Sequence, residues 1–169
     1  MTKRIARMMR EEDEGFTLIE LMVVVLIIGI LIAIALPTFL GARARAQNRA
    51  AQSGLRNGIA AAKTLYTDND NYSTASQVNL EATEPSLTFP ATASTGPTVV
   101  SWAVGNVTGT DQQVFGAAAL SDSGNCYYIK TVEASGGTGA GNTPGTWFGS
   151  GAVCTGTAAL SNSTSTKFP

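Results

Sequence analysis

A long apolar run dominates the N-terminal part of the chain. Residues 21–36 read LMVVVLIIGILIAIAL, sixteen positions without one polar side chain. With residues 16–20 and 37–40 added, the run reaches the ~20 residues that an α-helix needs to cross the hydrocarbon core of a bilayer. Either a membrane anchor or a secretory signal peptide has this pattern. Glu20 is the only charged residue between positions 16 and 42, and it argues against a removed signal peptide because a carboxylate is costly inside an apolar span.

The apolar run leads directly into a segment with helical periodicity. Apolar residues recur there every three or four positions, which predicts one apolar stripe on an amphipathic helix. The stripe consists of Ala51, Leu55, Ile59, Ala62 and Tyr66. Gly54 and Gly58 each disfavour a helix by ~1 kcal/mol, so two glycines four residues apart indicate that another element packs closely on the backbone here. The turn-forming residues 68–71 predict where the helix ends.

We therefore expect one long helix from Phe16 to Thr67. If it is continuous, it is ~78 Å long at a rise of 1.5 Å per residue. Pro37 removes one backbone donor, and glycine is a further weak point, so we expect Gly29 and Pro37 to be positions where the helix kinks.

Four short runs typical of β-strands follow the helix. They are rich in Val, Tyr, Trp and Phe and are separated by Gly, Asn and Ser; they cover residues 98–104, 112–120, 125–133 and 146–154. Their spacing predicts an antiparallel sheet of four strands whose apolar face lies on the helical stripe. The expected fold class is therefore α+β, a long N-terminal helix packed on a small antiparallel sheet. Residues 73–97, with three prolines, and the glycine-rich residues 134–145 are predicted to be irregular.

Composition excludes several classes of catalytic site. The chain has 169 residues and contains no histidine, which removes the usual Ser-His, Cys-His and zinc sites. Two cysteines are too few for a thiolate zinc site. The net charge of −1 hides an uneven distribution, because residues 43–63 carry five basic side chains and no acid, whereas residues 68–169 have a balance of −5. An acidic C-terminal part lacks the electrostatic attraction that DNA binding needs, so no nucleic-acid site is evident.

Three other groups of side chains have a structural interpretation that we favour. Asp68, Asp70 and Asn71 carry oxygen ligands but lack the glycine and the distal glutamate of a calcium loop, so a turn is expected. Glu81 and Glu84 lie in a predicted loop and give no glycosidase geometry. The aromatic residues are expected to pack in the core or between subunits rather than to stack on a ligand; they are Trp102, Tyr127, Tyr128, Trp147 and Phe148.

The sequence from Glu14 to Pro37, EGFTLIELMVVVLIIGILIAIALP, resembles the class III signal and N-terminal helix of a type IV pilin. The resemblance covers residues 1–70 by motif, and a glycine and an aromatic residue followed by Thr-Leu-Ile-Glu form a highly specific signal. The positions that match with the family's spacing are Gly15, Phe16, Thr17, Leu18, Ile19, Glu20, Leu21, Gly29 and Pro37. The leader of fifteen residues is longer than is usual among pilins that begin with phenylalanine, which leaves the subtype open.

The resemblance implies that the chain is made as a precursor and then processed. A prepilin peptidase would cut between Gly15 and Phe16 and methylate the new amino group of Phe16. In a filament, Glu20 of an incoming subunit would neutralise the Phe16 amine of its neighbour, and this pairing would select the correct stagger. The implied organisation is a leader (1–15), a membrane-spanning and filament-core helix (16–42), the amphipathic helix of the head (43–67), and the αβ-loop, sheet and disulfide-bounded C-terminal region (68–169).

The function implied by the resemblance is structural, with neither catalysis nor a cofactor or metal. The chain would be a major pilin that polymerises into a type IV pilus for adhesion, motility or DNA uptake. It would be a single-pass protein of the inner membrane as a precursor and extracellular as a filament. The implied partners are further copies of the chain, minor pilins, the prepilin peptidase, an assembly ATPase and a platform protein. The alternatives are a minor pilin or type II secretion pseudopilin, and, in another class, a membrane-anchored monomeric binding module.

The two cysteines are expected to form a disulfide. Cys126 and Cys154 both lie in the part that would be exported, and an exported pair is most simply one disulfide. The arrangement also resembles that of type IV pilins, in which such a pair staples the C-terminal region of the head. The alternative is two reduced thiols.

Overall fold

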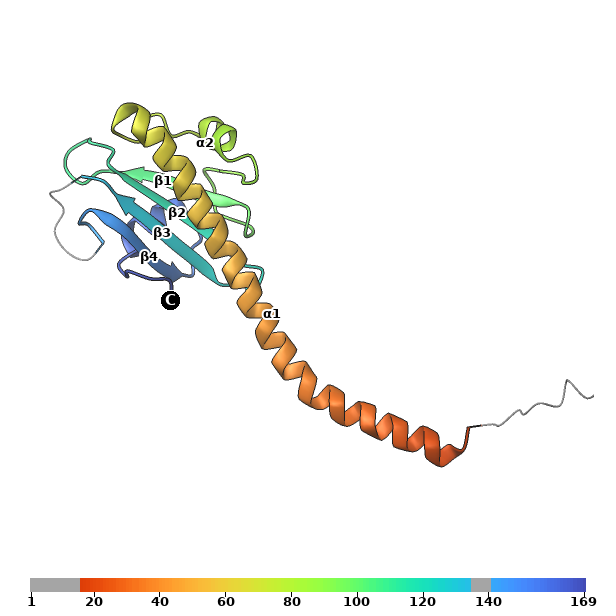
Figure 1. The fold of residues 1–169 in the computed structure, drawn as a ribbon. Helices are drawn as coiled ribbons and strands as arrows, with labels where there is room; N and C mark the ends of the chain where they lie inside the picture. The colour runs from red at the N-terminus through yellow and green to blue at the C-terminus, as the bar shows by residue number, and fades with distance from the viewer. Residues whose placement is uncertain (1–15, 135–140) are drawn as a thin grey trace, which may run out of the picture. The chain divides into compact units, whose positions relative to one another are not determined.

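The computed structural model describes residues 16–134 and 141–169, and the chain divides into two compact units after Ala42. Seven elements follow one another along the chain (Figure 1). They are helix α1 (Leu18–Asn69), helix α2 (Gln77–Thr83), strands β1 (Val100–Gly105), β2 (Val114–Leu120), β3 (Cys126–Val132) and β4 (Gly145–Gly151), and helix α3 (Gly156–Asn162). Helix α1 contributes residues to both units.

The four strands form one antiparallel sheet in the order β1-β2-β3-β4. Each strand pairs with its neighbour in the sequence, so the sheet is a meander; Ala118, for example, lies opposite Tyr128, which in turn lies opposite Gly149. All four strands fall within or next to the runs expected from the sequence. The predicted α+β architecture, a long N-terminal helix with a four-stranded antiparallel sheet, is confirmed.

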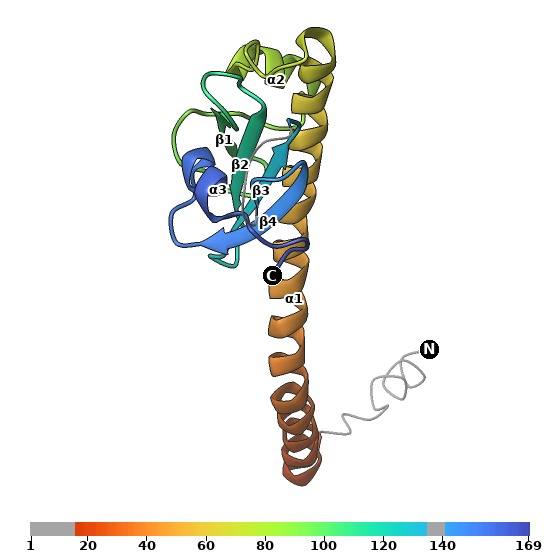
Figure 2. The same ribbon diagram turned by 90° about the vertical axis from the view of Figure 1, so that its left-hand side faces the viewer.

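One face of the sheet packs on residues 43–69 of α1 (Figure 2). The period of two along a strand sends alternate side chains to this face, among them Ala117, Ala119, Tyr127 and Ile129. They meet the helical stripe predicted from the sequence, in which Ala51, Leu55, Ile59 and Ala62 are buried and Tyr66 is half-buried. The expected packing of the sheet's apolar face on this stripe is therefore present.

The close approach expected at the two glycines of α1 is also present. A Cβ atom on Gly54 would lie 2.4 Å from the carbonyl oxygen of Pro97, and one on Gly58 would lie 3.4 Å from Phe89 and Val100 side-chain atoms. The loop that leads into β1 thus passes directly over the helix backbone.

Helix α3 covers the opposite face of the sheet. The sequence pattern did not predict this helix. Cys126, Tyr128 and Ala118 point to this side and pack with Cys154 and Ala159. The seven residues of α3, GTAALSN, are too few to show a helical period, and Gly, Thr, Ser and Asn among them disfavour a helix, so the apolar pattern held no signal for this helix. Its start is fixed instead by the N-cap, because the side chain of Thr155 accepts a hydrogen bond from the Ala158 N–H at 3.2 Å.

A buried lysine holds the other end of α3. The amine of Lys130, from β3, donates a hydrogen bond to the carbonyl oxygen of Leu160 at 2.8 Å. Leu160 belongs to the last turn of the helix, where carbonyl groups lack intrahelical partners and a positive charge is favourable. Burial lowers the pKa of the Lys130 amine.

We expect Gly156→Ala to destabilise the head by about 3 kcal/mol, at the upper end of overpacking penalties. A Cβ atom at this position would lie 2.1 Å from the carbonyl carbon of Trp102, and backbone cannot swing aside as a side chain does. Moving α3 away would also break the bond from the Gly156 N–H to Ser101 Oγ, 3.0 Å long and buried. Urea unfolding of the purified chain, followed by tryptophan fluorescence, measures the change.

Gly96→Ala is the matched control for this substitution. Nothing lies within 4 Å of the position that its Cβ would take. Its effect should stay within about 0.5 kcal/mol, as for an ordinary surface change. Equal stability of the two variants would show that α3 does not press on β1 as described.

Residues 73–97 are not wholly irregular, and this prediction was wrong in part. They contain α2, whose N-cap Ser76 accepts a hydrogen bond from the Asn79 N–H at 3.2 Å. One side chain, Leu80, anchors the helix in the core with no exposed surface. A helix of two turns with a single buried residue shows no period in the sequence, which is why it was missed. In the other segment predicted to be irregular, 134–145, residues 135–140 lie outside the described residues.

The C-terminal segment closes the outer edge of β4. Ser165 and Phe148 exchange two backbone hydrogen bonds of 2.7 and 3.0 Å. Three residues further on, the ring of Phe168 lies 4.5 Å from that of Phe148 and 5.0 Å from the guanidinium carbon of Arg56 on α1. The last residues of the chain therefore tie the sheet edge to the helix.

Candidate functional site

The candidate site at the start of α1 is built from a threonine and a glutamate three residues apart. The Glu20 N–H donates to the Thr17 carbonyl oxygen at 3.1 Å and approaches its hydroxyl oxygen at 3.3 Å. The same hydroxyl donates to the Glu20 carboxylate at 3.4 Å. Thr-x-x-Glu is the spacing of a capping box, and a negative charge in the first turn is favoured by the helix dipole. Thr17 was named above only as part of the motif, although its spacing from Glu20 predicts this local contact.

Phe16 precedes the helix and is 81% exposed, while Gly15 lies outside the described residues. Of the residues predicted to take part in processing and assembly, the structure therefore describes Phe16 and Glu20. Phe16 makes no contact within the described chain that would bury its ring. Both residues are accessible to another molecule.

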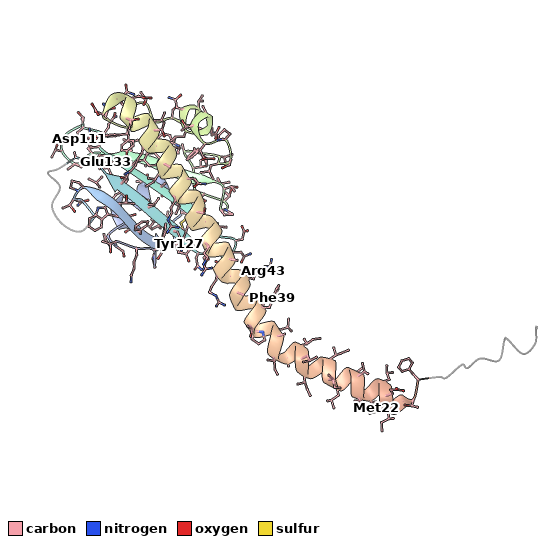
Figure 3. The ribbon with its side chains drawn as sticks, viewed as in Figure 1. Met22, Phe39, Arg43, Asp111, Tyr127 and Glu133 are labelled. Carbon is pink, nitrogen blue, oxygen red and sulfur yellow. A yellow bond between two sulfur atoms is a disulfide. The ribbon has the colours of Figure 1, made fainter. Side chains whose placement is uncertain are left out.

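The next turns of α1 expose an apolar surface. Large side chains from Leu18 to Leu40 are 45–75% exposed, and Met22 and Phe39 project outward from the helix in Figure 3. Within the described part of the chain, α1 is the one helix long and apolar enough to cross a membrane, with a mean hydropathy of 3.1 in its most apolar window. An exposed apolar surface of this extent is normally buried against lipid or against another protein.

Helix α1 continues through Gly29 and Pro37. Pro37 cannot donate to the carbonyl of Ala33, and one residue later the Thr38 hydroxyl donates to the Ile34 carbonyl at 3.4 Å. Nothing lies within 4 Å of a Cβ atom built on Gly29. The kink at these two positions stays a prediction.

A polar cluster ties the C-terminal end of α1 to the sheet. The Glu133 carboxylate accepts hydrogen bonds from the hydroxyls of Thr131 at 2.7 Å and Tyr72 at 3.0 Å, and lies 3.3 Å from the amine of Lys63. Burial raises the pKa of the Glu133 carboxyl, but the two hydrogen bonds and the Lys63 charge together outweigh it and hold the pKa below its usual value. Burial, with the nearby Glu133 charge, raises the pKa of the Tyr72 phenol. No sequence signal joins these residues, because they come from separate elements.

We expect Glu133→Gln to lower the free energy of unfolding at pH 7 by about 1 kcal/mol, after discounting the ion pair for its solvent exposure. A carboxyl whose pKa is lowered on folding stabilises the protein above its unfolded pKa of about 4.3, and this stabilisation disappears as the pH falls through the folded value. The difference in stability between the two proteins should therefore shrink as the pH is lowered from 7 to below the folded pKa of Glu133. Urea unfolding at both pH values measures this, and a difference that persists at low pH would exclude the linkage.

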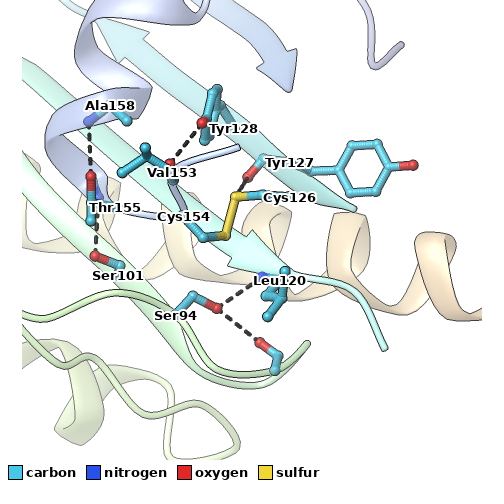
Figure 4. The surroundings of a disulfide bond; sticks show 12 residues. Ser94, Ser101, Leu120, Cys126, Tyr127, Tyr128, Val153, Cys154, Thr155 and Ala158 are labelled. Carbon is cyan, nitrogen blue, oxygen red and sulfur yellow. Dashed lines mark hydrogen bonds between the residues drawn. A yellow bond between two sulfur atoms is a disulfide. The ribbon is translucent and has the colours of Figure 1, made fainter. Parts of the chain in front are cut away.

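The disulfide joins β3 to the segment before α3 (Figure 4). Cys126 and Cys154 are 28 residues apart, with a Cα–Cα distance of 5.5 Å. Two hydrogen bonds hold the same segment, one from Tyr128 Oη to the Val153 carbonyl at 2.7 Å and one from the Ser94 N–H to the Cys154 carbonyl at 2.8 Å. The bridge therefore fixes the entry to α3 on the sheet.

Replacing both Cys126 and Cys154 by serine should lower the free energy of unfolding by about 3.5 kcal/mol in the chain-entropy model. The reason is that the bridge restricts the unfolded chain over the loop that it closes. Chemical denaturation of the two proteins gives the difference. The native protein should also show no titratable thiol, and two free thiols would contradict the bridge.

The other candidate residues serve local structure. Asn71 Oδ1 accepts a hydrogen bond from the Ser73 N–H at 2.9 Å, and Asp70 has a φ of 52°, so this segment is a turn. Trp102 stacks on Phe115 with ring centroids 6.2 Å apart, consistent with core packing. Among residues 16–134 and 141–169, no group of three acidic or cysteine side chains is placed to hold a metal ion.

Comparison with known proteins places the start of α1 in a known family. The profile described as "Prokaryotic N-terminal methylation motif" matches residues 13–36, which include the Phe16–Glu20 site. The chain is 48% identical over 61 residues to the type IV major pilin protein PilA of Myxococcus xanthus, covering 36% of this chain and 28% of that protein. Residues 13–36 therefore carry the N-terminal motif of the type IV pilin and pseudopilin superfamily.

Two further relatives come from both branches of this superfamily. The type IV wide pilus major component PilA4 of Thermus thermophilus is 36% identical over 81 residues, covering 45% of this chain and 61% of that protein. The type II secretion system core protein G of Pseudomonas aeruginosa is 42% identical over 76 residues, covering 44% of this chain and 52% of that protein.

The similarity is partial in both directions. The chain spans less than two thirds of the length of each of these relatives, and each match covers less than half of this chain. No solved structure matches the chain significantly. Members of the superfamily are in general structural proteins rather than enzymes.

Proposed function

We propose that this chain is the major structural subunit of a type IV pilus and performs no catalysis. The observation that carries the proposal is the first part of α1, where Phe16 and Glu20 precede an exposed apolar stretch of helix from Leu21 to Leu40. A soluble enzyme or binding domain would leave this apolar surface in contact with water, whereas a membrane or a bundle of identical helices covers it. The major pilins among the relatives support the same assignment.

The proposed assembly step depends on a new charge. Cleavage between Gly15 and Phe16 by a prepilin peptidase leaves an amine on Phe16, which is then methylated. Glu20 of an incoming subunit pairs with this amine on its neighbour while both leave water. An unpaired carboxylate in an apolar bundle is costly, so only the stagger that brings the two charges together is stable.

The proposed organisation follows from this step. Residues 1–15 form the leader, 16–42 the membrane-spanning and filament-core helix with kinks at Gly29 and Pro37, 43–67 the amphipathic helix of the head, and 68–169 the remaining head. The precursor resides in the inner membrane as a single-pass protein with its basic leader in the cytoplasm. An assembly ATPase and a platform protein then add it to an extracellular filament used for adhesion, motility or DNA uptake, with minor pilins as further subunits.

A second candidate is a pseudopilin of a type II secretion system, or a minor pilin. It is favoured by the relatives named core protein G. A pseudopilin forms a short periplasmic filament, so it is not abundant in material sheared from cells. A membrane-anchored monomeric binding module is a third candidate, and it predicts no self-association that depends on Glu20.

The test is intact mass and N-terminal sequencing of filaments sheared from the cell surface. We expect the dominant protein to begin with methylated Phe16. A processed chain found only in membranes would favour the pseudopilin or minor pilin. A chain that begins near Ala42 would overturn the proposal, because the filament-core helix would have been removed as a signal peptide.

A further inference from the structure

Three arginines directly after the apolar segment of α1 have no partner in the described chain. We call Arg43, Arg45 and Arg49 the arginine cluster. All three are exposed, as Figure 3 shows for Arg43. None of them makes a hydrogen bond or ion pair with residues 16–134 or 141–169, in which the single ion pair joins Lys63 to Glu133. The three charges therefore take part in no polar contact that stabilises the described fold.

The two remaining cations of α1 differ from the arginine cluster. Arg56 lies over the ring of Phe168 at 5.0 Å, and Lys63 pairs with Glu133 at 3.3 Å. Cations further along the helix thus have partners in the head. The contrast indicates that the arginine cluster has its partner outside the chain.

Position along the helix indicates what that partner is. Leu40 is the last large residue of the apolar segment. Arg43, Arg45 and Arg49 follow it by three, five and nine residues. At a rise of 1.5 Å per residue these positions lie ~5, ~8 and ~14 Å beyond the apolar segment. The headgroup region on each side of a bilayer is ~5–8 Å thick. Two arginines thus fall within the headgroup layer, and the third is near enough to reach it with its long side chain.

The charge of this segment fits an anionic partner. No acidic residue occurs between Glu20 and Asp68. In the proposed topology the arginine cluster lies on the side of the membrane opposite the leader, where basic residues weaken the charge asymmetry that orients the helix, so they need another role. A guanidinium group pairs with phosphate through two parallel hydrogen bonds, which a lysine amine does not match.

We propose that the arginine cluster binds the phosphate groups of anionic phospholipids while the chain is held in the membrane. The inference rests on the proposed function, because it requires the apolar segment to span a bilayer. The cluster fixes the depth of the helix in the membrane and retains the subunit until assembly withdraws it. A contact of this kind is worth about five-fold in lipid association for each basic residue near an anionic surface.

The test uses the full chain reconstituted in vesicles of phosphatidylcholine with 30% phosphatidylglycerol. Electron paramagnetic resonance of spin-labelled lipids measures the association of each lipid with the protein. The double variant Arg43→Gln/Arg45→Gln, which removes the two arginines inside the headgroup layer, is compared with Arg56→Gln/Lys63→Gln, which removes the same charge from the same helix at positions outside this layer. The leader cations contribute equally to all the proteins, so that the difference between variants isolates the cluster.

We expect the selectivity for phosphatidylglycerol over phosphatidylcholine at low salt to be at least five-fold lower in the first variant than in the unmodified chain. The second variant should retain the selectivity of the unmodified chain. Equal losses would show that only net charge matters and would overturn the inference. Unchanged selectivity in both variants would also overturn the inference. If crosslinking between copies of the chain then depends on the arginine cluster, the partner of the cluster is another subunit, with Asp68 and Asp70 as candidates. A chain that does not insert into vesicles at all would refute membrane storage itself, and so the proposed function.

Discussion

Replacing Glu20 by valine is expected to leave the precursor processed but to reduce surface filaments at least ten-fold. The new Phe16 amine would then enter the apolar bundle without a counter-charge. Loss of one partner of a buried ion pair costs about 3–5 kcal/mol, because the remaining charge is left uncompensated. Electron microscopy and quantification of sheared pilin measure assembly, while the size of the membrane-bound chain on a gel reports processing.

Two control variants separate the charge of Glu20 from its local contact with Thr17. Glu20→Gln keeps the length of the side chain and an oxygen that accepts the bond from the Thr17 hydroxyl, which is 3.4 Å long in the structure. It should nevertheless fail to assemble, since it lacks the charge. Thr17→Val removes the local contact and keeps the charge, so it should assemble. The reverse result would assign Glu20 to capping the helix rather than to pairing with a neighbour.

Replacing Gly15 by valine is expected to block processing almost completely. A peptidase that cuts at the membrane surface must bind the backbone on both sides of the bond, and glycine leaves the backbone open where a branched side chain obstructs it. The uncut leader also removes the Phe16 amine, so filaments should be lost together with cleavage. Immunoblots of membrane fractions should show only the full-length chain.

Gly41→Ala is a suitable control for the Gly15 substitution. It also adds a side chain to a glycine near the membrane surface, but 26 residues from the predicted bond. Its processing should be normal. A normally processed Gly15→Val protein would contradict the cleavage site, whatever the state of the filaments.

The sequence predicted elements that have a long and regular pattern. The helical stripe from Ala51 to Tyr66 has a period that only an amphipathic helix explains, and the apolar strands that follow supplied the face on which it packs. The strands were predictable for the same reason, since aromatic and β-branched runs alternate with turn formers. Both signals extend over many residues and do not depend on a single contact.

Helices α2 and α3 were missed because tertiary contacts form them. Each has seven residues, and isolated helices of that length are unstable in water. Leu80 in the core and Gly156 against β1 hold them in place. Neither contact leaves a local pattern, and Gly156 in particular appears in the sequence as an ordinary turn residue.

The candidate site was predictable only in part. Phe16 and Glu20 were found by resemblance to a motif, and their spacing also carries a physical signal for the start of a helix. The polar cluster around Glu133 was not predictable, because Tyr72 and Glu133 are 61 positions apart in the chain. Only the fold brings the segment after α1 close to the C-terminal end of β3.

The position of α3 and the C-terminal segment has a consequence for the order of synthesis. The stripe on α1, which ends at Tyr66, is made early, but the strands that bury it begin only at Val100. Closure of the second face requires residues 156–162, and the edge of β4 requires Ser165 and Phe168. A growing chain therefore keeps apolar surface open until these residues have been made. Folding of the head is a late event, and a chain that stops before Ser165 lacks the contacts that complete it.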